Sequence, residues 1–277
     1  MTEPRRKRPR KSLGQHWLVD RRLLNRIAAA ADPGPEDTVL EIGAGTGLLT
    51  DALAQRAARL IAVEVDPDLA ERLRQHFIDR PEVSVVAADA LSVPPEELLT
   101  AAGSRPPYLL VGNLPYFIGT AIVRHFLRAA VPPRQLLVTL QADVAGRIAA
   151  PPGRMSYLSV ETQLFAEARI LFFLPPSAFR PPPKVHSALL RLDTRDRIAV
   201  DVDDPEAFLR LVQAGFAAPR KRTRNSLAVG LRASPSQAGA MLYAAAIDEG
   251  LRPASLNLED WARLYMAYRQ PITAGAE

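Results

Sequence analysis

The sequence predicts an α/β fold: a parallel sheet with helices on both faces, followed by a small helical domain. Short apolar segments alternate with helical patterns over most of the chain, which is typical of such sheets. At 277 residues the chain is long enough for one large domain, or for a large domain and a small one. Strands are expected at residues 38–42, 60–64, 83–87, 108–112, 136–140, 170–174 and 187–192.

The helical patterns divide the chain into two parts. Before Asp193 they fill the gaps between predicted strands, whereas after it they follow one another without strands. The turn-rich residues 201–204 indicate a linker between the two parts. We therefore expect a large domain over residues 12–198 and a helical C-terminal domain over residues 199–277. Helices are expected at residues 48–56, 67–77, 120–130, 208–216, 224–231 and 258–268.

The composition excludes several classes of protein. The hydrophobic content of 48% is enough for a packed core. There is no cysteine, which excludes disulfides, thiolate nucleophiles and cysteine-bound zinc and fits a cytoplasmic protein. His76, His125 and His186 lack the spacing of metal ligands, so no metal cofactor is expected. No apolar run approaches the ~18 residues that span a bilayer, so no membrane attachment is expected.

Basic side chains concentrate in two segments. Residues 1–11 carry six basic side chains and one acid, and we expect them to form a flexible tail. Residues 207–247 carry six basic side chains and no acid. Segments of a single charge sign suggest a polyanion as the partner. Solvated protein surfaces can also carry such runs, so charge alone leaves both interpretations open.

A glycine-rich loop follows the first predicted strand. Its spacing differs from the dinucleotide pattern G-x-G-x-x-G, because position 48 is Leu48 rather than glycine. The observed loop, with Gly43 and Gly45, resembles that of S-adenosylmethionine-dependent methyltransferases, in which it approaches a methionine and a ribose. A tight turn without a ligand is the alternative for a glycine loop taken alone.

Acidic residues at the ends of the next two predicted strands support a nucleoside cofactor. Glu64 ends the second strand, where a carboxylate can accept both ribose hydroxyls. Asp89 follows the third strand and can accept a hydrogen bond from the adenine amine. The glycine loop and two acids at successive strand ends together predict a Rossmann-type cofactor site.

The tetrapeptide Asn113-Leu114-Pro115-Tyr116 follows the fourth predicted strand. The amine of adenine is a poor nucleophile, because its lone pair is delocalised into the ring. The Asn113 side-chain oxygen and the Leu114 carbonyl can accept its N–H groups and aim the lone pair, and Tyr116 can stack on the base. Pro115 has no N–H and stiffens the turn. An ordinary strand-ending turn is the alternative.

Five motifs in order resemble those of the ribosomal RNA adenine-N6 dimethyltransferases of the KsgA/RsmA type. Besides the glycine loop and the tetrapeptide 113–116, they are an N-terminal motif at residues 11–18, an aromatic-proline motif at residues 179–185 and a basic signature at residues 220–227. The likeness runs from about Lys11 to Leu227 and is weaker beyond. This resemblance implies a Rossmann-type methyltransferase sheet with a small C-terminal helical domain.

The resemblance also assigns roles to single residues. Tyr116 and Phe179 are implied to sandwich the target adenine. The implied substrate is two adjacent adenines in the 3′-terminal hairpin of 16S rRNA, each dimethylated, within a precursor 30S subunit. The implied ligands of S-adenosylmethionine are His16, Leu18, Gly43, Gly45, Glu64, Asp89 and Asn113. The RNA-binding residues are expected to be Arg220, Lys221, Arg222 and Arg224, and the protein is expected to be a monomer.

Several positions depart from the family pattern, among them His16, Pro219 and Arg222. Trp17 stands where the family usually has phenylalanine, and Phe117 and Gly119 replace an asparagine and a serine after the tetrapeptide. The loss of two small polar groups beside the base could alter how the pocket accepts a monomethylated amine. The order of the two methylations is not encoded in any of these motifs.

Alternative functions share part of this pattern. An Erm-type 23S rRNA methyltransferase has the same fold, but Leu114 and residues 220–227 favour the small-subunit enzyme. A non-catalytic ribosome assembly factor on the same fold would bind particles without turnover, and the intact tetrapeptide argues against it. A DNA adenine methyltransferase is less favoured, because the chain shows no module that reads DNA sequence.

Overall fold

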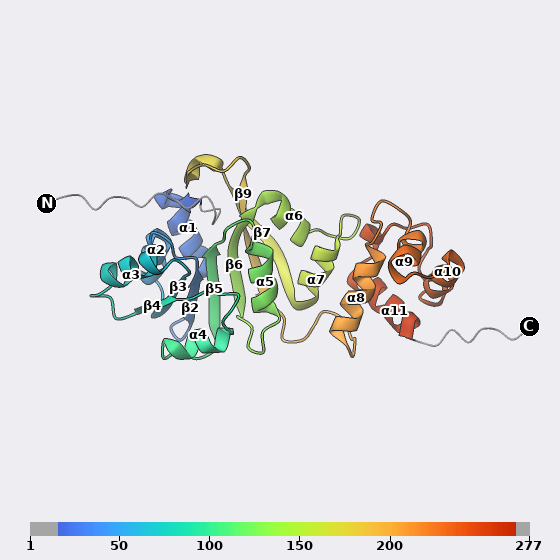
Figure 1. Ribbon diagram of the computed structural model, residues 1–277, viewed down its shortest axis with the longest axis horizontal. Coiled ribbons are helices and arrows are strands. Elements are labelled where there is room, and N and C mark those ends of the chain that lie inside the picture. The colour runs from blue at the N-terminus through green and yellow to red at the C-terminus, as the bar shows by residue number, and fades with distance from the viewer. Residues whose placement is uncertain (1–15, 270–277) are drawn as a thin grey trace, which may run out of the picture. The chain divides into compact units, whose positions relative to one another are not determined.

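The computed structural model describes residues 16–269, so the expected tail at residues 1–11 lies outside the described residues. The chain forms two compact units (Figure 1). Within the described range, the first unit comprises residues 16–145 and 167–194, and the second comprises residues 146–166 and 195–269.

The boundary between the units differs from the expected division near residue 198. Residues 146–166 were expected in the sheet domain, yet they belong to the second unit. The physical reason is packing, because Met155, Val160 and Leu164 are buried in the same hydrophobic cluster as the C-terminal helices.

The first unit is built on a seven-stranded sheet in the order β4-β3-β2-β5-β6-β9-β7. Strands β2 to β6 pair in parallel, whereas β9 runs antiparallel to β6, so the sheet is mixed rather than wholly parallel. All seven expected strands form. Their bounds are β2 Thr38–Ile42, β3 Arg59–Glu64, β4 Val83–Ala87, β5 Tyr108–Asn113, β6 Gln135–Gln141, β7 Ala166–Leu174 and β9 Ser187–Thr194.

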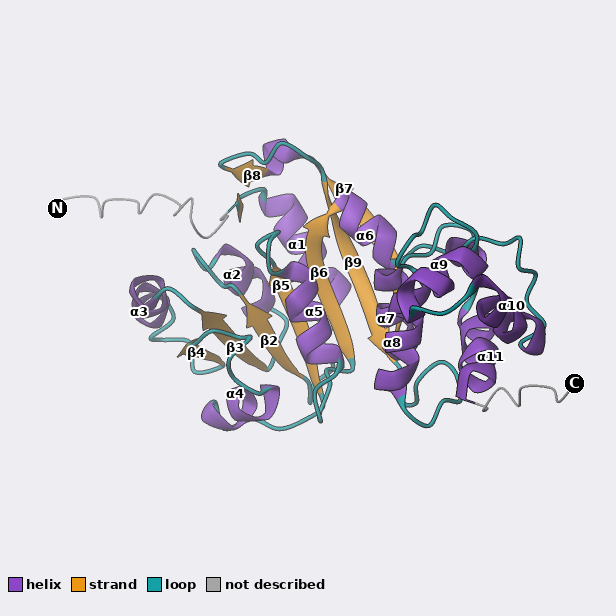
Figure 2. Ribbon diagram, turned by 45° about the vertical axis from the view of Figure 1, so that its right-hand side comes forward, coloured by secondary structure: helices purple, strands orange, loops and turns teal. Residues whose placement is uncertain are grey.

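Helices cover both faces of this sheet (Figure 2). The first face carries Leu109 and Leu137, which share a buried cluster with residues of α1 and α2. Side chains alternate along a strand, so Leu140 points to the opposite face, where it lies against Gly119 at the start of α5. The helices of this unit are α1 Arg21–Ala31, α2 Leu48–Ala54, α3 Pro67–His76, α4 Pro95–Ala101 and α5 Gly119–Leu127, and α6 Ala142–Ile148 crosses the boundary to the second unit.

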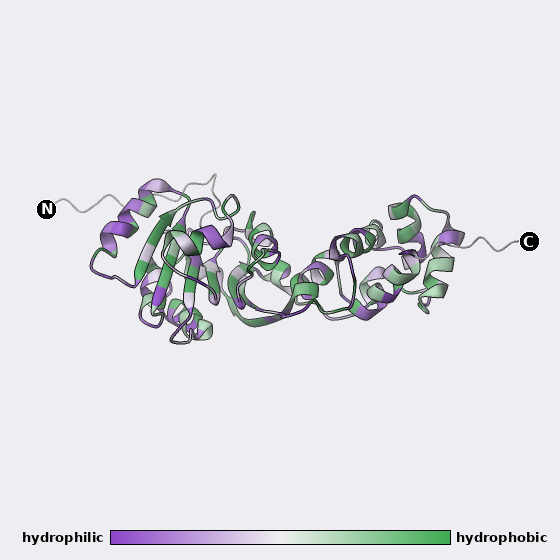
Figure 3. Ribbon diagram, turned by 90° about the horizontal axis from the view of Figure 1, so that it is seen from below, coloured by the Kyte–Doolittle hydropathy of each residue, from purple (hydrophilic) through white to green (hydrophobic). Residues whose placement is uncertain are grey.

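The register of the parallel strands brings their carboxyl ends to one edge of the sheet. Ile42 pairs with Val63, and Glu64 pairs with Ala87 on the next strand. The backbone N–H of Gly43 donates to the Val63 carbonyl oxygen at 2.9 Å, which holds the loop after β2 against β3. Figure 3 shows that the central strands are largely hydrophobic along their length, in keeping with their burial. Polar groups therefore gather in the loops at this edge.

A short pair of strands completes the first unit. The strand β1 (Trp17–Leu18) runs antiparallel to β8 (Phe179–Arg180), with Leu18 opposite Phe179. Neither strand was expected, because two residues are too few to show a periodic pattern. The pairing fixes the start of the described chain beside a segment more than 150 residues later in the sequence.

The second unit is helical. Its core contains Trp261, Phe208 and Tyr265, all nearly inaccessible to solvent. Helix α10 was not expected from the sequence. The helices are α7 Tyr157–Phe165, α8 Pro205–Gly215, α9 Thr223–Leu231, α10 Pro235–Ala244 and α11 Leu258–Arg269. Across residues 16–269, no helix is both long and apolar enough to cross a membrane.

Candidate active site

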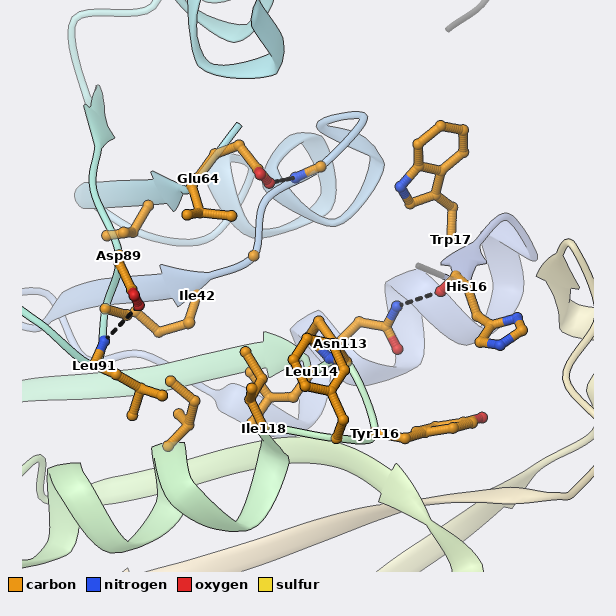
Figure 4. A pocket seen from close by; sticks show the side chains of 18 of the residues that line it. His16, Trp17, Ile42, Glu64, Asp89, Leu91, Asn113, Leu114, Tyr116 and Ile118 are labelled. Atoms are coloured by element: carbon orange, nitrogen blue, oxygen red, sulfur yellow. Dashed lines mark hydrogen bonds between the residues drawn. The ribbon is translucent and has the colours of Figure 1, made fainter. Parts of the chain in front are cut away.

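A cavity of about 240 Å³ lies at the carboxyl ends of the parallel strands (Figure 4). It is lined by the loop after β2, the ends of β3 and β5, the segment after β4, and the turn that leads into α5. Ligands of open α/β sheets bind at this edge, because the loops there diverge and expose backbone and side-chain polar groups. The cavity is therefore the candidate site of the first unit.

The glycine loop reaches the cavity with a backbone that other residues rarely adopt. Gly43 and Gly45 have φ angles of +77° and +57°, in the left-handed region that favours glycine. A Cβ atom on Gly45 would lie 3.5 Å from the indole of Trp17, on the wall of the same cavity. The loop thus leaves room for a ligand against its backbone, as expected for a cofactor loop.

Glu64 is held at the end of β3 by two backbone groups. Its side chain is only 3% exposed and accepts hydrogen bonds from the N–H of Gly45 at 2.8 Å and of Asp66 at 2.9 Å. Burial raises the pKa of this carboxyl, while the two N–H donors oppose that shift. Each oxygen accepts one protein donor and keeps a lone pair for a ligand hydroxyl. Glu64 lines the cavity, in the position predicted for a ribose acceptor.

Asp89 lines the cavity from an exposed turn after β4. Its Oδ1 accepts the N–H of Leu91 at 3.0 Å, and its Oδ2 accepts the Ser92 hydroxyl at 3.3 Å. These bonds fix the carboxylate at the rim of the cavity (Figure 4). An exposed carboxylate with a fixed direction is suited to accept a ligand amine.

Asn113 ends β5 with its side-chain amide directed by a backbone acceptor. The Nδ2 atom donates to the carbonyl oxygen of His16 at 2.9 Å. Because the amide nitrogen is engaged there, the oxygen turns away from His16 and toward the side of the cavity where Tyr116 lies (Figure 4). The predicted gripping atom therefore faces a cavity shared with the glycine loop.

Tyr116 is anchored at both its hydroxyl and its ring. The hydroxyl lies 2.7 Å from the Ser187 hydroxyl, and burial raises its pKa, so it stays protonated at neutral pH. The imidazole of His16 stacks on the ring at a centroid distance of 5.6 Å and an interplanar angle of 28°. The Nδ1 atom of His16 donates to the Pro181 carbonyl at 2.8 Å. This stacking was not foreseen from the sequence.

Phe179 and Leu18 lie deeper than the sequence implied. Phe179 is 1% exposed and packs in the core, reaching the cavity wall from inside the unit. Leu18 is buried in the same cluster and does not line the cavity. Successive side chains of a strand point to opposite sides, so Trp17 faces the cavity while Leu18 faces the core. The side chain of Leu18 thus supports the β1–β8 pair rather than contacting a ligand in the cavity.

The expected RNA-binding residues lie around the start of α9 in the second unit. Arg220, Lys221 and Arg222 are exposed, whereas Arg224 forms an ion pair with Glu249 at 3.0 Å. Arg224 therefore differs from its neighbours, because an acid beyond the basic segment balances its charge.

A fourth exposed basic residue joins this group. The N–H and the hydroxyl of Thr223 both donate to the carbonyl oxygen of Leu251, at 2.7 and 2.8 Å. These bonds hold the exposed Arg252 next to the start of α9. Sequence reasoning missed Arg252, because it lies outside the acid-free segment 207–247 and only the fold brings it close.

The two departures after Tyr116 have different structural settings. Gly119 is buried, and a Cβ atom there would collide with the side chain of Leu140 on β6. The absence of a side chain at Gly119 therefore leaves room for the side chain of Leu140. Phe117, in contrast, is exposed and lines the cavity.

Within the described part of the chain, no group of three His, Cys, Asp or Glu residues could hold a metal ion. His76 lies 3.3 Å from Asp51, and His125 lies 3.3 Å from the Val93 carbonyl oxygen. These histidines thus have protein partners at separate places. The expectation that no metal is used stays a prediction.

The mixed sheet, the positive-φ glycine loop and the acids at the next strand ends define the first unit as a methyltransferase of the S-adenosylmethionine-dependent class. The chain belongs to the ribosomal RNA adenine dimethylase family, whose family model matches residues 6–270. The resemblance inferred from the sequence motifs is thereby confirmed.

Curated relatives cover most of the chain. Three proteins named ribosomal RNA small subunit methyltransferase A are similar to it. The relative from Dehalococcoides mccartyi is 39% identical over 94% of this chain and 88% of its own. The relative from Moorella thermoacetica is 40% identical, with coverages of 92% and 91%, and the one from Syntrophotalea carbinolica is 41% identical, with coverages of 93% and 96%.

Solved structures show the same architecture. The 23S rRNA methyltransferase ErmE is 32% identical, with a TM-score of 0.72 over 92% of this chain and 100% of its own. A dimethyladenosine transferase from Plasmodium falciparum has a TM-score of 0.77 at 20% identity, with coverages of 92% and 98%, and is similar in fold. The predicted fold class, a Rossmann-type methyltransferase sheet with C-terminal helices, is confirmed.

A second buried carboxyl lies on β2, two residues before Gly43. Glu41 on β2 is 1% exposed, and its Oε2 atom has no hydrogen-bond partner. Burial raises the pKa of Glu41 from 4.5 to about 8, and the charges of Glu64 and Asp51 act in the same direction. An acid with a raised native pKa stabilises the fold most below its unfolded pKa and loses that contribution as the pH rises through its native pKa.

We expect the variant Glu41→Gln to gain stability relative to the wild type as the pH rises from 4.5 to about 8. Glutamine imitates the protonated acid and has no charge to bury. Denaturant unfolding at a series of pH values measures the difference, with the exposed Glu36→Gln as the control variant. A difference between wild type and Glu41→Gln that stays constant over this range would contradict the buried-acid interpretation.

Proposed function

We propose that this protein transfers methyl groups to N6 of two adjacent adenines in the 3′-terminal hairpin of 16S rRNA, within a precursor of the 30S subunit. The observation that carries the proposal is the Asn113 amide oxygen, which faces a cavity shared with the glycine loop. The names of the curated relatives support the small subunit as the substrate. The proposal implies a cytoplasmic protein that acts as a monomer without a metal ion.

The hydrogen-bonding groups that line the cavity match those of S-adenosylmethionine. Glu64 keeps lone pairs for the ribose hydroxyls, and Asp89 offers a fixed carboxylate to the adenine amine. The backbone at Gly43 and Gly45 leaves space that a Cβ atom would narrow. When bound, this cofactor supplies a methyl group on a positively charged sulfur.

The residues of the tetrapeptide would prepare the adenine amine. In the first transfer the Asn113 oxygen and the Leu114 carbonyl would accept the two N–H groups, which pulls the nitrogen lone pair out of conjugation and directs it into the cavity. In the second transfer one N–H group remains to be accepted. Tyr116, held by Ser187, supplies a flat surface for the base. No general base is needed before attack, because the alkylated nitrogen becomes acidic. Orientation and electrostatics then provide most of the rate.

The buried Phe179 supports this site from behind. The ring of Phe179 closes the cavity wall. The backbone of Phe179 pairs with Leu18, and this pairing places His16 near Asn113 and Tyr116. A sandwich of the base between Tyr116 and Phe179 stays part of the proposal. It requires His16 to leave the face of Tyr116 on which it now stacks, or the base to approach from the other face.

The Erm-type activity is the second candidate, and the similarity to ErmE is the observation that favours it. The curated small-subunit relatives are more similar, at 39–41% identity. Leu114 and the signature at residues 220–227 also favour the small-subunit enzyme over the Erm type. A substrate test therefore separates the two.

Incubation with labelled S-adenosylmethionine and unmodified small subunits should label the 3′-terminal hairpin of 16S rRNA. Mass spectrometry of the reacted RNA should find two adjacent adenines, each with two methyl groups. Naked 23S rRNA serves as the competing substrate. Label on 23S rRNA alone, or on 16S rRNA only outside the hairpin, would reject the proposed substrate.

The variant Asn113→Ala should lower kcat by about 10²–10³-fold, the range for loss of one preorganised polar contact in a reacting site, while the Kd for small subunits stays nearly unchanged. Asn113→Asp is the matched variant. It keeps an oxygen in place but removes the Nδ2–H group that donates to His16, so we expect it to be impaired as well. Near-normal turnover of Asn113→Ala would contradict the base-gripping role.

We also propose that the basic residues around α9 bind rRNA. Replacing Arg220, Lys221 and Arg222 by alanine should weaken binding to small subunits and flatten its salt dependence. The slope of log K against log salt falls by about 0.7–0.9 for each lost phosphate contact. Arg59→Ala is the control, because Arg59 is exposed at the amino end of β3, away from the cavity. An unchanged slope in the triple variant would exclude these residues from the RNA interface.

A further inference from the structure

Phe117 lines the cavity, but the proposed methyl transfer assigns it no role. It directly follows the tetrapeptide 113–116 and lines the same cavity, yet its side chain is 62% exposed. The aromatic contacts among residues 16–269 do not include it. A phenyl ring left in water contributes little to the stability of the fold, so its place on the cavity wall calls for an explanation from binding.

The turn presents this ring on a fixed backbone. The Pro115 carbonyl oxygen accepts the N–H groups of Ile118 and Gly119, both at 3.1 Å. The preceding side chain, Tyr116, is anchored through Ser187. Phe117 is therefore an exposed aromatic surface between an anchored tyrosine and the buried start of α5. Such a preformed surface loses little conformational freedom when a ligand covers it.

The position of the turn favours RNA over the cofactor as the occupant. The groups that fit the cofactor come from the ends of β2 and β3 and the segment after β4, at Gly43, Glu64 and Asp89. Phe117 comes instead from the turn after β5, next to Asn113 and Tyr116, which are assigned to the target base. Phe117 therefore lies beside the residues assigned to the RNA and not beside those assigned to the cofactor.

Extrusion of the target adenine leaves a stacking defect in the RNA. The neighbouring base loses one of its stacking partners when the target enters the cavity. Proteins that bind unstacked RNA replace such contacts with aromatic rings. We propose that the ring of Phe117 stacks on the base adjacent to the target adenine. This inference rests on the proposed function, in which that neighbour is the second adenine of the pair.

The stacking role assigns a purpose to a departure from the family pattern. Asparagine, the usual residue at this position, offers no flat apolar surface, whereas phenylalanine provides one for any base. Phe117 would thus hold the second adenine outside the cavity while Asn113 and Tyr116 hold the first. Phe117 would touch the RNA without taking part in the transfer itself. Its loss should therefore change kcat/KM for small subunits and leave the Kd for S-adenosylmethionine unchanged.

The variant Phe117→Ala should lower kcat/KM for small subunits by roughly tenfold or more, the size expected for loss of one base–aromatic stack. Its Kd for S-adenosylmethionine should stay within about twofold of the wild type, because the ring is assigned to the RNA. Loss of a stacking contact with the cofactor would raise that Kd by about tenfold. Phe117→Trp should retain most of the activity, because it keeps a flat ring. Phe173→Ala is the matched control, since Phe173 is 59% exposed on β7 and does not line the cavity.

A double-mutant cycle tests the contact itself. Small subunits are reconstituted with 16S rRNA that carries an abasic nucleotide beside the target adenine, and kcat/KM for the first methyl transfer is compared. The kcat/KM of the wild type should fall on the abasic particle by about the same factor as the kcat/KM of Phe117→Ala falls on the intact particle. The variant should lose little more on the abasic particle, because the contact is already absent.

Three outcomes would overturn the inference. The first is a kcat/KM of Phe117→Ala equal to that of Phe173→Ala. The second is a weaker Kd for S-adenosylmethionine in Phe117→Ala. The third is additive effects on kcat/KM of the variant and the abasic nucleotide in the double-mutant cycle. The second outcome would assign Phe117 to the cofactor instead of RNA. A wild type that labels no small-subunit RNA would instead sink the proposed function, and the stacking role with it. The wild-type assay on intact particles therefore separates the two failures.

Discussion

The hydrogen bond from the Asn113 amide to the carbonyl oxygen of His16 is the contact on which the geometry of the site depends. The parallel sheet can deliver an asparagine to the cavity, but it cannot decide which end of the amide faces the ligand. That choice is made by the carbonyl group of His16, which directly precedes β1, the strand that pairs with β8. The N-terminal motif thus orients the tetrapeptide, although the two lie almost a hundred residues apart.

The cofactor side of the cavity depends on a different balance, between burial and backbone donors. Glu64 and Glu41 are both buried carboxyls near the glycine loop. Burial raises the pKa of both carboxyls, but two N–H groups that donate to Glu64 oppose the shift there, whereas the Oε2 atom of Glu41 has no hydrogen-bond partner. The strands beside the glycine loop therefore carry an acid whose oxygens can accept ligand hydroxyls and an acid that burial keeps protonated to a higher pH.

The sequence predicted what depends on local pattern and missed what depends on distant contacts. The seven strands and the strand-end acids follow from apolar runs of ordinary length, and parallel register then brings their ends together. The two-residue strands β1 and β8 have no detectable period, and α10, which contains three alanines and one glycine, has only a weak apolar face. The burial of Leu18, the Arg224–Glu249 pair and the proximity of Arg252 to α9 all require tertiary packing.

Gly119 and Phe117 show why a departure from a family motif must be interpreted from its surroundings. Both replace small polar residues on the same turn, and from sequence alone both could alter the fit of the substrate amine. Gly119 is buried, and the space it leaves is taken by Leu140, so packing within the fold accounts for it. Phe117 has no such compensation, because its ring remains exposed at the cavity. Phe173 is almost as exposed but lies away from the cavity, so it is the place of Phe117 on the cavity wall that favours contact with a bound molecule.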